Sequence, residues 1–139
     1  MLTVSCEIKA PVNKIWSALT NKDEMKIWYF DIPEFVLEEN AVFNFYEPGE
    51  NKKFLHRCTI QSIQPEKKFQ HTWTYPAYSE GVSVVTWNLE VTDMGTLVKL
   101  THEGLENFEH AGSDFALANF VVGWNEIINK MLRNYVEKV

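Results

Sequence analysis

Histidines His56, His71 and His102 could act together if they face one interior. All three fall on the apolar positions of alternating segments, and neutral imidazole is a common zinc ligand. The turn at Pro65 lies at unequal distances from His56 and His71, so we do not expect these two to lie opposite each other. No Asp, Glu or Cys cluster at metal-ligand spacing accompanies them. The sequence therefore predicts no metal and no cofactor, and each histidine is expected to hydrogen-bond a neighbour or a water.

His102 alone is a better candidate for acid–base catalysis. It ends an inner-facing segment within reach of Trp124, and a partly desolvated imidazole can have a pKa suited to proton transfer. Tyr75, on the same inner parity, could supply a hydroxyl partner. Because the sequence names no substrate, a core or ligand-orienting role for His102 is the favoured interpretation. No nucleophile elbow, glycine-rich phosphate loop, carboxylate pair or HExxH motif is present.

A surplus of aromatic side chains points to ligand binding. Aromatic residues make up 14% of the chain, with Trp 5 and Phe 9. Bulky rings can line a cavity or fill it, so the cavity is expected to be small and to suit a flat aromatic or short acyl ligand. The candidate ligand-binding residues are Trp28, Phe30, Phe45, His56, His71, Trp73, Tyr75, Trp87, His102, Phe120 and Trp124.

Alternating hydrophobicity predicts the strands that position these residues. Apolar and polar residues alternate in segments 2–8, 41–47, 53–63, 69–75, 82–92 and 96–103, and turn residues such as Pro48-Gly49 separate them. Short turns between successive strands predict an antiparallel sheet with one buried face. The outer face carries a few apolar exceptions, which are Val42, Tyr46, Leu55 and Val84.

Helical spacing appears in two places. After the first strand, Pro11 suits a first helical turn, and a capping box beginning at Thr20 predicts a second short helix that carries Met25, Ile27 and Trp28. The stretch 113–139 predicts one long amphipathic helix. Its apolar stripe is Leu117, Val121, Trp124, Ile128, Met131, Tyr135 and Val139, widened by Phe115, Phe120, Ile127 and Leu132. The fold class is therefore α+β, with the inner face of a curved sheet packed on the last helix.

Segment 103–112 connects the last strand to this helix. Gly104 and Gly112 stand at its ends, and Leu105 and Phe108 could plug an interior. A connection of this kind could act as a lid over a cavity, or could simply join the two elements.

Composition excludes several classes of protein. At 139 residues the chain fits one domain, 1–139, with 45% hydrophobic residues and a net charge of −6. That charge, with an isoelectric point near 5.2, argues against nucleic-acid binding. No signal peptide or membrane span is visible, so a cytoplasmic location is expected. Cys6 and Cys58 are interpreted as reduced core thiols.

The two ends of the chain resemble one family. Ile8-Lys9-Ala10-Pro11-Val12, then Ile15-Trp16-Ser17-Ala18-Leu19-Thr20 and Trp28, and later Val98 to Leu105 with Gly123-Trp124, resemble the SRPBCC (START/Bet v 1-like) superfamily. The resemblance is to the branch similar to the C-terminal domain of the activator of Hsp90 ATPase, and it covers nearly the whole chain. It implies a helix-grip fold: a curved six-stranded antiparallel sheet wrapped around a long C-terminal helix, with an apolar cavity that opens near the two short helices. No counterpart of the separate Hsp90-docking domain is present, so an ATPase-activator role is not expected to carry over.

Three functions from different classes remain open. The favoured one is a binding or carrier domain for a small apolar or aromatic molecule, in a stress setting by analogy with the relatives. The second is a cyclase- or aromatase-like enzyme that uses His102 with Tyr75. The third is a chaperone-linked domain that contacts a protein partner through its outer sheet. The protein itself is expected to be a monomer or a dimer. Replacing His102 by Ala should spare ligand affinity within about tenfold if the residue only orients a ligand, but should abolish turnover if it is catalytic.

Overall fold

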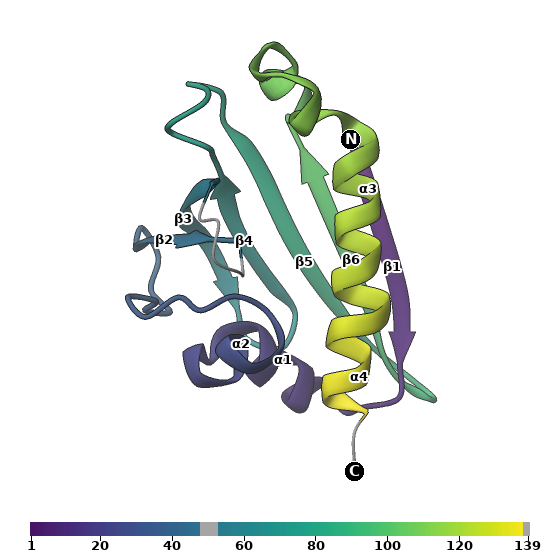
Figure 1. Cartoon of the computed structure of the whole chain (residues 1–139). Helices are drawn as coiled ribbons and strands as arrows, with labels where there is room; N and C mark the ends of the chain where they lie inside the picture. Colours follow the sequence, from purple (N-terminus) through teal and green to yellow (C-terminus); the bar gives the residue numbers. More distant parts are fainter. Residues whose placement is uncertain (48–52, 138–139) are drawn as a thin grey trace.

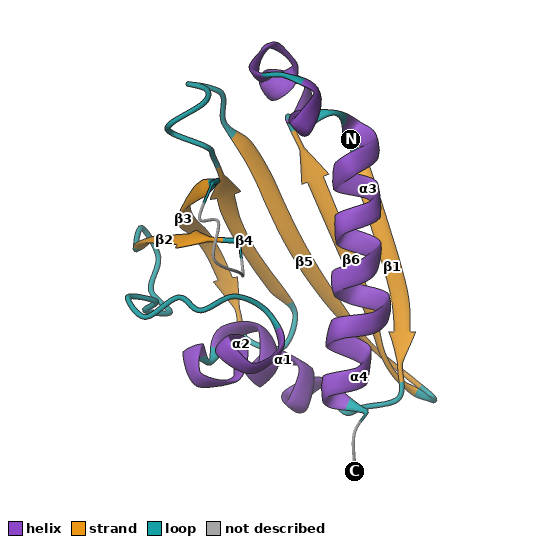
Figure 2. Ribbon diagram, viewed as in Figure 1, coloured by secondary structure: helices purple, strands orange, loops and turns teal. Residues whose placement is uncertain are grey.

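One antiparallel sheet forms the frame of the molecule, in a computed structural model that describes residues 1–47 and 53–137. Its strand order is β1-β6-β5-β4-β3-β2, and Figures 1 and 2 show the sheet curving behind the last helix. The strands are β1 (Leu2–Ile8), β2 (Val42–Tyr46), β3 (Leu55–Gln64), β4 (Lys68–Trp73), β5 (Ser83–Thr92) and β6 (Gly95–Glu103). The predicted α+β fold and its six strands are therefore confirmed, while the predicted turn at Pro48-Gly49 lies outside the described residues.

Alternation along the strands decides which side chains face inward. β1 alternates buried and exposed residues throughout, and β6 buries Val98, Leu100 and His102. β4 ends at Trp73 rather than at the predicted Tyr75, because Thr74 continues the pairing only as an isolated bridge to Arg57. The inner face thus carries the histidines and tryptophans as the alternation predicts.

Helices α1 (Val12–Thr20) and α2 (Lys22–Trp28) follow the first strand as predicted. Pro11 precedes α1 in an extended conformation. The cap of α2 is Asn21, not Thr20: the Asn21 side chain accepts hydrogen bonds from the backbone N–H groups of Asp23 and Glu24 at 3.0 and 3.1 Å. The Thr20 hydroxyl instead donates to the carbonyl of Trp16 at 2.7 Å, within the preceding helix, and the side chain that caps α2 is that of Asn21.

The long C-terminal helix consists of three consecutive parts. They are α3 (Leu117–Glu126), a π-helical stretch (Ile127–Leu132) and α4 (Arg133–Val136). The helix starts four residues later than predicted, because 3-10 helices occupy Leu105–Ala111 and Ser113–Phe115. The predicted end of the helix at Val139 lies outside the described residues.

The π-helical stretch also moves the buried stripe of this helix. The residues buried there are Trp124, Ile128, Leu132 and Val136, at steps of four rather than the mean 3.6, because π turns hold more residues than α turns. The predicted stripe is wrong at the start of the helix, where Leu117 is 55% exposed. Phe108 and Leu105, in the segment before the helix, are buried and so anchor that segment to the core.

Candidate functional site

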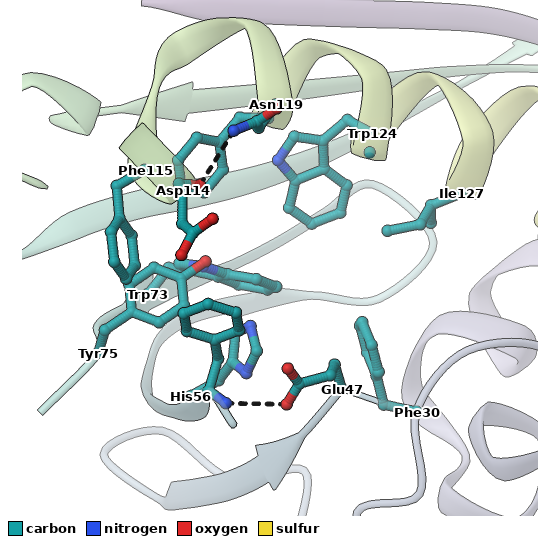
Figure 3. Close-up of a pocket in the computed structure, with 13 residues that line it drawn as sticks. Phe30, Glu47, His56, Trp73, Tyr75, Asp114, Phe115, Asn119, Trp124 and Ile127 are labelled. Atoms are coloured by element: carbon teal, nitrogen blue, oxygen red, sulfur yellow. Dashed lines mark hydrogen bonds between the residues drawn. The ribbon is translucent and has the colours of Figure 1, made fainter. Parts of the chain in front are cut away.

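A pocket lies between the C-terminal helix and the strands at the β2 side of the sheet. Its volume is about 200 Å³, smaller than the roughly 300–1,000 Å³ of sites for drug-sized ligands. Figure 3 shows its lining, which comes from β3, β4, α3 and the connections beside them. The lining residues are Phe30, Glu47, Phe54, His56, Trp73, Tyr75, Asp114, Phe115, Asn119, Phe120, Gly123, Trp124 and Ile127.

Three aromatic rings meet at nearly right angles in one corner of this pocket. Phe54 and Phe115 are inclined at 87°, Phe54 and Tyr75 at 79°, and Tyr75 and Phe115 at 72°. Their centroids lie 4.8 to 6.4 Å apart. Edge-to-face contacts of this kind are favourable for aromatic pairs, so the three rings stabilise one another as the walls of a corner.

The floor of the pocket is formed by tryptophans from two elements. Trp73 of β4 and Trp124 of α3 lie 5.2 Å apart between ring centroids. The indole N–H of Trp73 donates to the hydroxyl of Tyr75 at 2.9 Å. Burial raises the pKa of Tyr75 above its usual value, so this hydroxyl stays protonated at neutral pH.

Polar groups form the rim. Glu47 Oε1 accepts a hydrogen bond from the backbone N–H of Phe54 at 2.9 Å, which Figure 3 shows as a dashed line. The Asn119 amide donates to the carbonyls of Ser113 and Asp114 at 3.0 and 3.2 Å. These contacts hold the short 3-10 helix Ser113–Phe115 against the start of α3 and so fix the Asp114 carboxylate at the rim.

His56 is the histidine that lines the pocket. Its ring stacks on Phe45 at 4.6 Å with an interplanar angle of 7°. Its Nδ1 lies 3.3 Å from the carbonyl of Phe45 and donates to it. Burial lowers the pKa of His56 to about 4, so the ring is neutral at pH 7.

His102 lies behind the pocket, in a chain of hydrogen bonds that runs from Trp124 to the backbone of Trp73. The indole N–H of Trp124 donates to His102 Nδ1 at 3.0 Å. Because Nδ1 accepts, the neutral ring carries its proton on Nε2, which donates to the Ser83 hydroxyl at 2.8 Å. Ser83 in turn donates to the carbonyl of Trp73 at 2.7 Å. Burial, with a smaller contribution from the nearby His71, lowers the pKa of His102 to about 3.

The predicted pairing of His102 with Tyr75 does not form as a hydrogen bond. Both ring nitrogens of His102 are used by Trp124 and Ser83, and the Tyr75 hydroxyl accepts from Trp73. His102 is fully buried and is not part of the pocket lining. Its geometry is that of a residue joining the long helix to β5 and β6.

The candidate residues divide between the lining and the core behind it. Phe30, His56, Trp73, Tyr75, Phe120 and Trp124 line the pocket. The remaining candidates, Trp28, Phe45, His71, Trp87 and His102, are buried in the surrounding core. Of these, Trp28 donates its indole N–H to the carbonyl of Ala18 at 2.8 Å, and His71 donates Nδ1–H to the carbonyl of Thr72 at 2.8 Å. A ligand-binding role for any of them stays a prediction.

Several lining residues were not among the candidates. Phe54 lies on the inner parity of its strand, and Phe115 and Ile127 belong to the apolar positions of 113–139, so hydrophobic pattern alone could have added them. Glu47, Asp114, Asn119 and Gly123 carry no such signal, because the fold brings them to one rim from distant segments.

Neither a metal cluster nor a membrane helix is found in the part of the chain that the structure describes. Within 1–47 and 53–137, no group of three or more His, Cys, Asp or Glu side chains could hold a metal ion. Both cysteines, Cys6 and Cys58, are free and buried. Over the same residues, no helix has the length and apolar character needed to cross a bilayer.

The apolar exceptions on the outer face do not form one patch. The strand register aligns Val42 with Thr59 on β3 and Val84 with Thr72 on β4, so two threonines separate the valines. Tyr46 pairs with Leu55 in a separate row. These four residues therefore do not form the contiguous apolar surface that a protein-interaction role would favour.

Comparisons with known proteins agree with this architecture. The model of a family described as Activator of Hsp90 ATPase homolog 1-like protein matches residues 9–137. No curated protein shows a significant match. Protein MLL2253 from Mesorhizobium loti has a solved structure with a TM-score of 0.81 and 23% identity, over 99% of this chain and 97% of that one.

Two further solved structures are similar at lower identity. CV1439 from Chromobacterium violaceum has a TM-score of 0.82 and 15% identity, over 99% of this chain and 98% of that one. DynU16, a protein of the dynemicin biosynthetic locus, has a TM-score of 0.79 and 15% identity, over 99% of this chain and 47% of that one. This chain therefore spans about half of DynU16. At these identities the similarity shows a shared fold.

Proposed function

The chain belongs to the Activator of Hsp90 ATPase homolog 1-like family, and from this premise we propose that it binds a small apolar or aromatic molecule in the pocket beside α3. The family match confirms the resemblance inferred from the two ends of the sequence. The fold alone does not choose a ligand, so the proposal rests on the pocket itself.

The main support for this proposal is the presence of a glycine, Gly123, in the pocket lining. It lies inside α3 and lines the pocket, although glycine within a helix costs about 1 kcal/mol relative to alanine. A Cβ atom added at Gly123 would meet no atom within 4 Å beyond its chain neighbours and the backbone of its own helix, so close packing does not explain the glycine. We interpret it as a residue that keeps the space above Trp73 and Trp124 open for a ligand.

The geometry favours binding over catalysis. A general base needs a free ring nitrogen within hydrogen-bond reach of the substrate, and both nitrogens of His102 already have partners. His56 does line the pocket, but a pKa of about 4 makes it a weak base at neutral pH. The cyclase- or aromatase-like alternative would therefore depend on His56 rather than on His102 with Tyr75.

The first experiment is native mass spectrometry of the protein purified from its own host. A defined apolar or aromatic molecule, released on denaturation at near-unit occupancy, would support the proposal and supply the ligand for titration. An empty protein would argue against a tight carrier. Titration with small aromatic compounds, followed by tryptophan fluorescence, would then test for weak binding, since Trp73 and Trp124 line the pocket.

Gly123→Leu is the variant that ties binding to this pocket. Its side chain would occupy the space that Gly123 leaves, and we expect affinity to fall by about tenfold or more, because a filled pocket excludes the ligand. Val122→Leu is the matched control, since Val122 is the neighbouring residue and is 69% exposed. Equal affinity in both variants would place the ligand elsewhere.

The physiological role, the cellular location and the protein partner of this binding domain are predictions. A stress-related role, a cytoplasmic location and a protein partner follow only from the family resemblance and the composition. Their tests are expression under stress, fractionation and partner capture with the intact protein.

A further inference from the structure

We propose that the pocket prefers a ligand whose apolar body carries a positive charge, such as an alkylammonium or an aryltrialkylammonium ion. This inference rests on the proposed binding function and narrows it to one ligand class. Three features of the pocket support it, namely its aromatic corner, its charges and the lysine beside it.

The aromatic corner groups three rings at one end of the pocket, where they line the space open to a ligand. Phe54, Tyr75 and Phe115 stand nearly perpendicular to one another, and Phe120 lies 6.3 Å from Tyr75. A cation within about 6 Å of ring faces is attracted by their negative potential, by about 2 kcal/mol where water is excluded. Boxes of several such rings are the usual way in which proteins hold quaternary ammonium groups.

Among the described residues, the charged groups of the lining are both acidic. Glu47 and Asp114 line the pocket, and no Lys or Arg within 1–47 and 53–137 does. The charge of Glu47 reaches the interior, because it opposes the fall in the pKa of His56 and contributes to the raised pKa of Tyr75. His56 is itself neutral at pH 7, so it does not repel a cation. An anionic ligand would face both carboxylates, of which Asp114 is partly compensated by its ion pair with Lys53 at the rim.

Lys53 shows the same preference within the chain. Its ammonium lies 5.0 Å from the centroid of Phe54 and 3.4 Å from Asp114 Oδ2. The ring and the carboxylate that it contacts both belong to the lining. The rim therefore already holds one ammonium between an aromatic ring and an acidic group, as the proposed ligand would be held farther in.

The test compares ligands of one shape and different charge by isothermal titration calorimetry at pH 7. Phenyltrimethylammonium is the cation, tert-butylbenzene the neutral isostere and benzenesulfonate the anion. We expect the cation to bind about tenfold more tightly than the neutral compound and the anion to bind least. Neutral binding as tight as that of the cation would overturn this inference and leave the proposed function standing. Absence of binding by all three would overturn both.

Charge variants locate the preference. Glu47→Gln keeps the side-chain oxygen that accepts from Phe54 N–H, and should weaken binding of the cation by about threefold while sparing the neutral compound. Lys53→Gln removes a competing ammonium and should strengthen binding of the cation. Asp93→Asn, in the exposed turn between β5 and β6, is the control and should change neither. A loss in Glu47→Gln that is equal for both compounds would contradict a charge preference.

Discussion

The indole N–H of Trp124 donates a hydrogen bond to His102 Nδ1 at 3.0 Å, and this bond joins the long helix to strand β6. The two residues lie 22 positions apart in the chain, and both are buried. Through Ser83 the chain of bonds continues to the backbone of Trp73 on β4. The orientation of Trp124, which forms part of the pocket floor, is thus set by a histidine outside the pocket.

Replacing His102 by Ala should destabilise the fold more than it weakens binding. The Trp124 N–H and the Ser83 hydroxyl would lose a buried partner and a cavity would remain, at a cost of about 2–4 kcal/mol in the free energy of unfolding. Urea denaturation measures this cost, and His110→Ala, at an exposed site, should change it by less than about 0.5 kcal/mol. Ligand affinity should stay within about tenfold, since His102 is outside the lining. If His102→Ala cost as little as the control, the hydrogen bonds of His102 would not stabilise the packing of the helix on the sheet.

Acid should destabilise the protein through its buried histidines. Burial lowers the pKa of His56 and His71 to about 4 and that of His102 to about 3, whereas unfolded histidines titrate near 6.5. Between these values the unfolded state binds more protons than the folded state. The free energy of unfolding is therefore highest above pH 6.5 and falls as the pH drops towards 4, by up to about 1.4 kcal/mol per pH unit for each histidine.

Urea denaturation at several pH values between 7.5 and 4.5 checks this slope. A His71→Asn variant lacks one of the three buried histidines, so its free energy of unfolding should depend on pH about a third less steeply, whatever the stability of the variant itself. A free energy of unfolding that stays constant from pH 7 to pH 5 would show that these rings do not lose their charge on folding.

The spacing at which hydrophobic residues recur in the sequence made most of the fold predictable. The strands follow from two-residue alternation, as in β1 and β6, because a sheet with one buried face requires it. The C-terminal helix was predictable from its wide apolar stripe, but the sequence did not identify all the residues that this helix buries. The π turns at Ile127–Leu132 shift the buried stripe from the predicted Met131 and Tyr135 to Leu132 and Val136, and no local residue type signals such turns.

The pocket was predictable only where its residues share the core pattern. Trp73 and Trp124 could be placed because they are large, apolar and on the inner parity. His102 and Phe120 show the same pattern, yet Phe120 lines the pocket and His102 lies behind the lining. An apolar position in the sequence does not tell whether its side chain contacts the pocket or packs behind it. The rim carboxylates, Glu47 and Asp114, come from segments that only the fold brings together.

Two glycines with positive φ should respond differently to substitution. Gly95 has φ +154°, and a Cβ there would lie 2.2 Å from the carbonyl oxygen of Ile8. Gly112 has φ +121°, but a Cβ there would meet nothing within 4 Å. Gly112→Ala should cost about 1 kcal/mol of backbone strain, and Gly95→Ala at least about 2 kcal/mol more, because the β1 backbone must also move. Thermal denaturation of the two variants measures the difference, and equal costs would mean that the turn at Gly95 relaxes freely.

Gly123→Ala should stabilise the protein while weakening its ligand affinity. Alanine restores helix propensity inside α3, and the free energy of unfolding should rise by up to about 1 kcal/mol, since the added methyl group meets no atom within 4 Å. The same methyl group narrows the pocket that Gly123 lines, so affinity should fall by about twofold to threefold, less than in Gly123→Leu. Val122→Ala, at the exposed neighbouring position, should stabilise the helix by about 0.5 kcal/mol and leave affinity unchanged. Calorimetric titration and urea denaturation of both variants separate the two effects. A lower stability of Gly123→Ala would show that the space beside the glycine is not free. A rise in stability together with a fall in ligand affinity would identify Gly123 as a residue kept for a ligand.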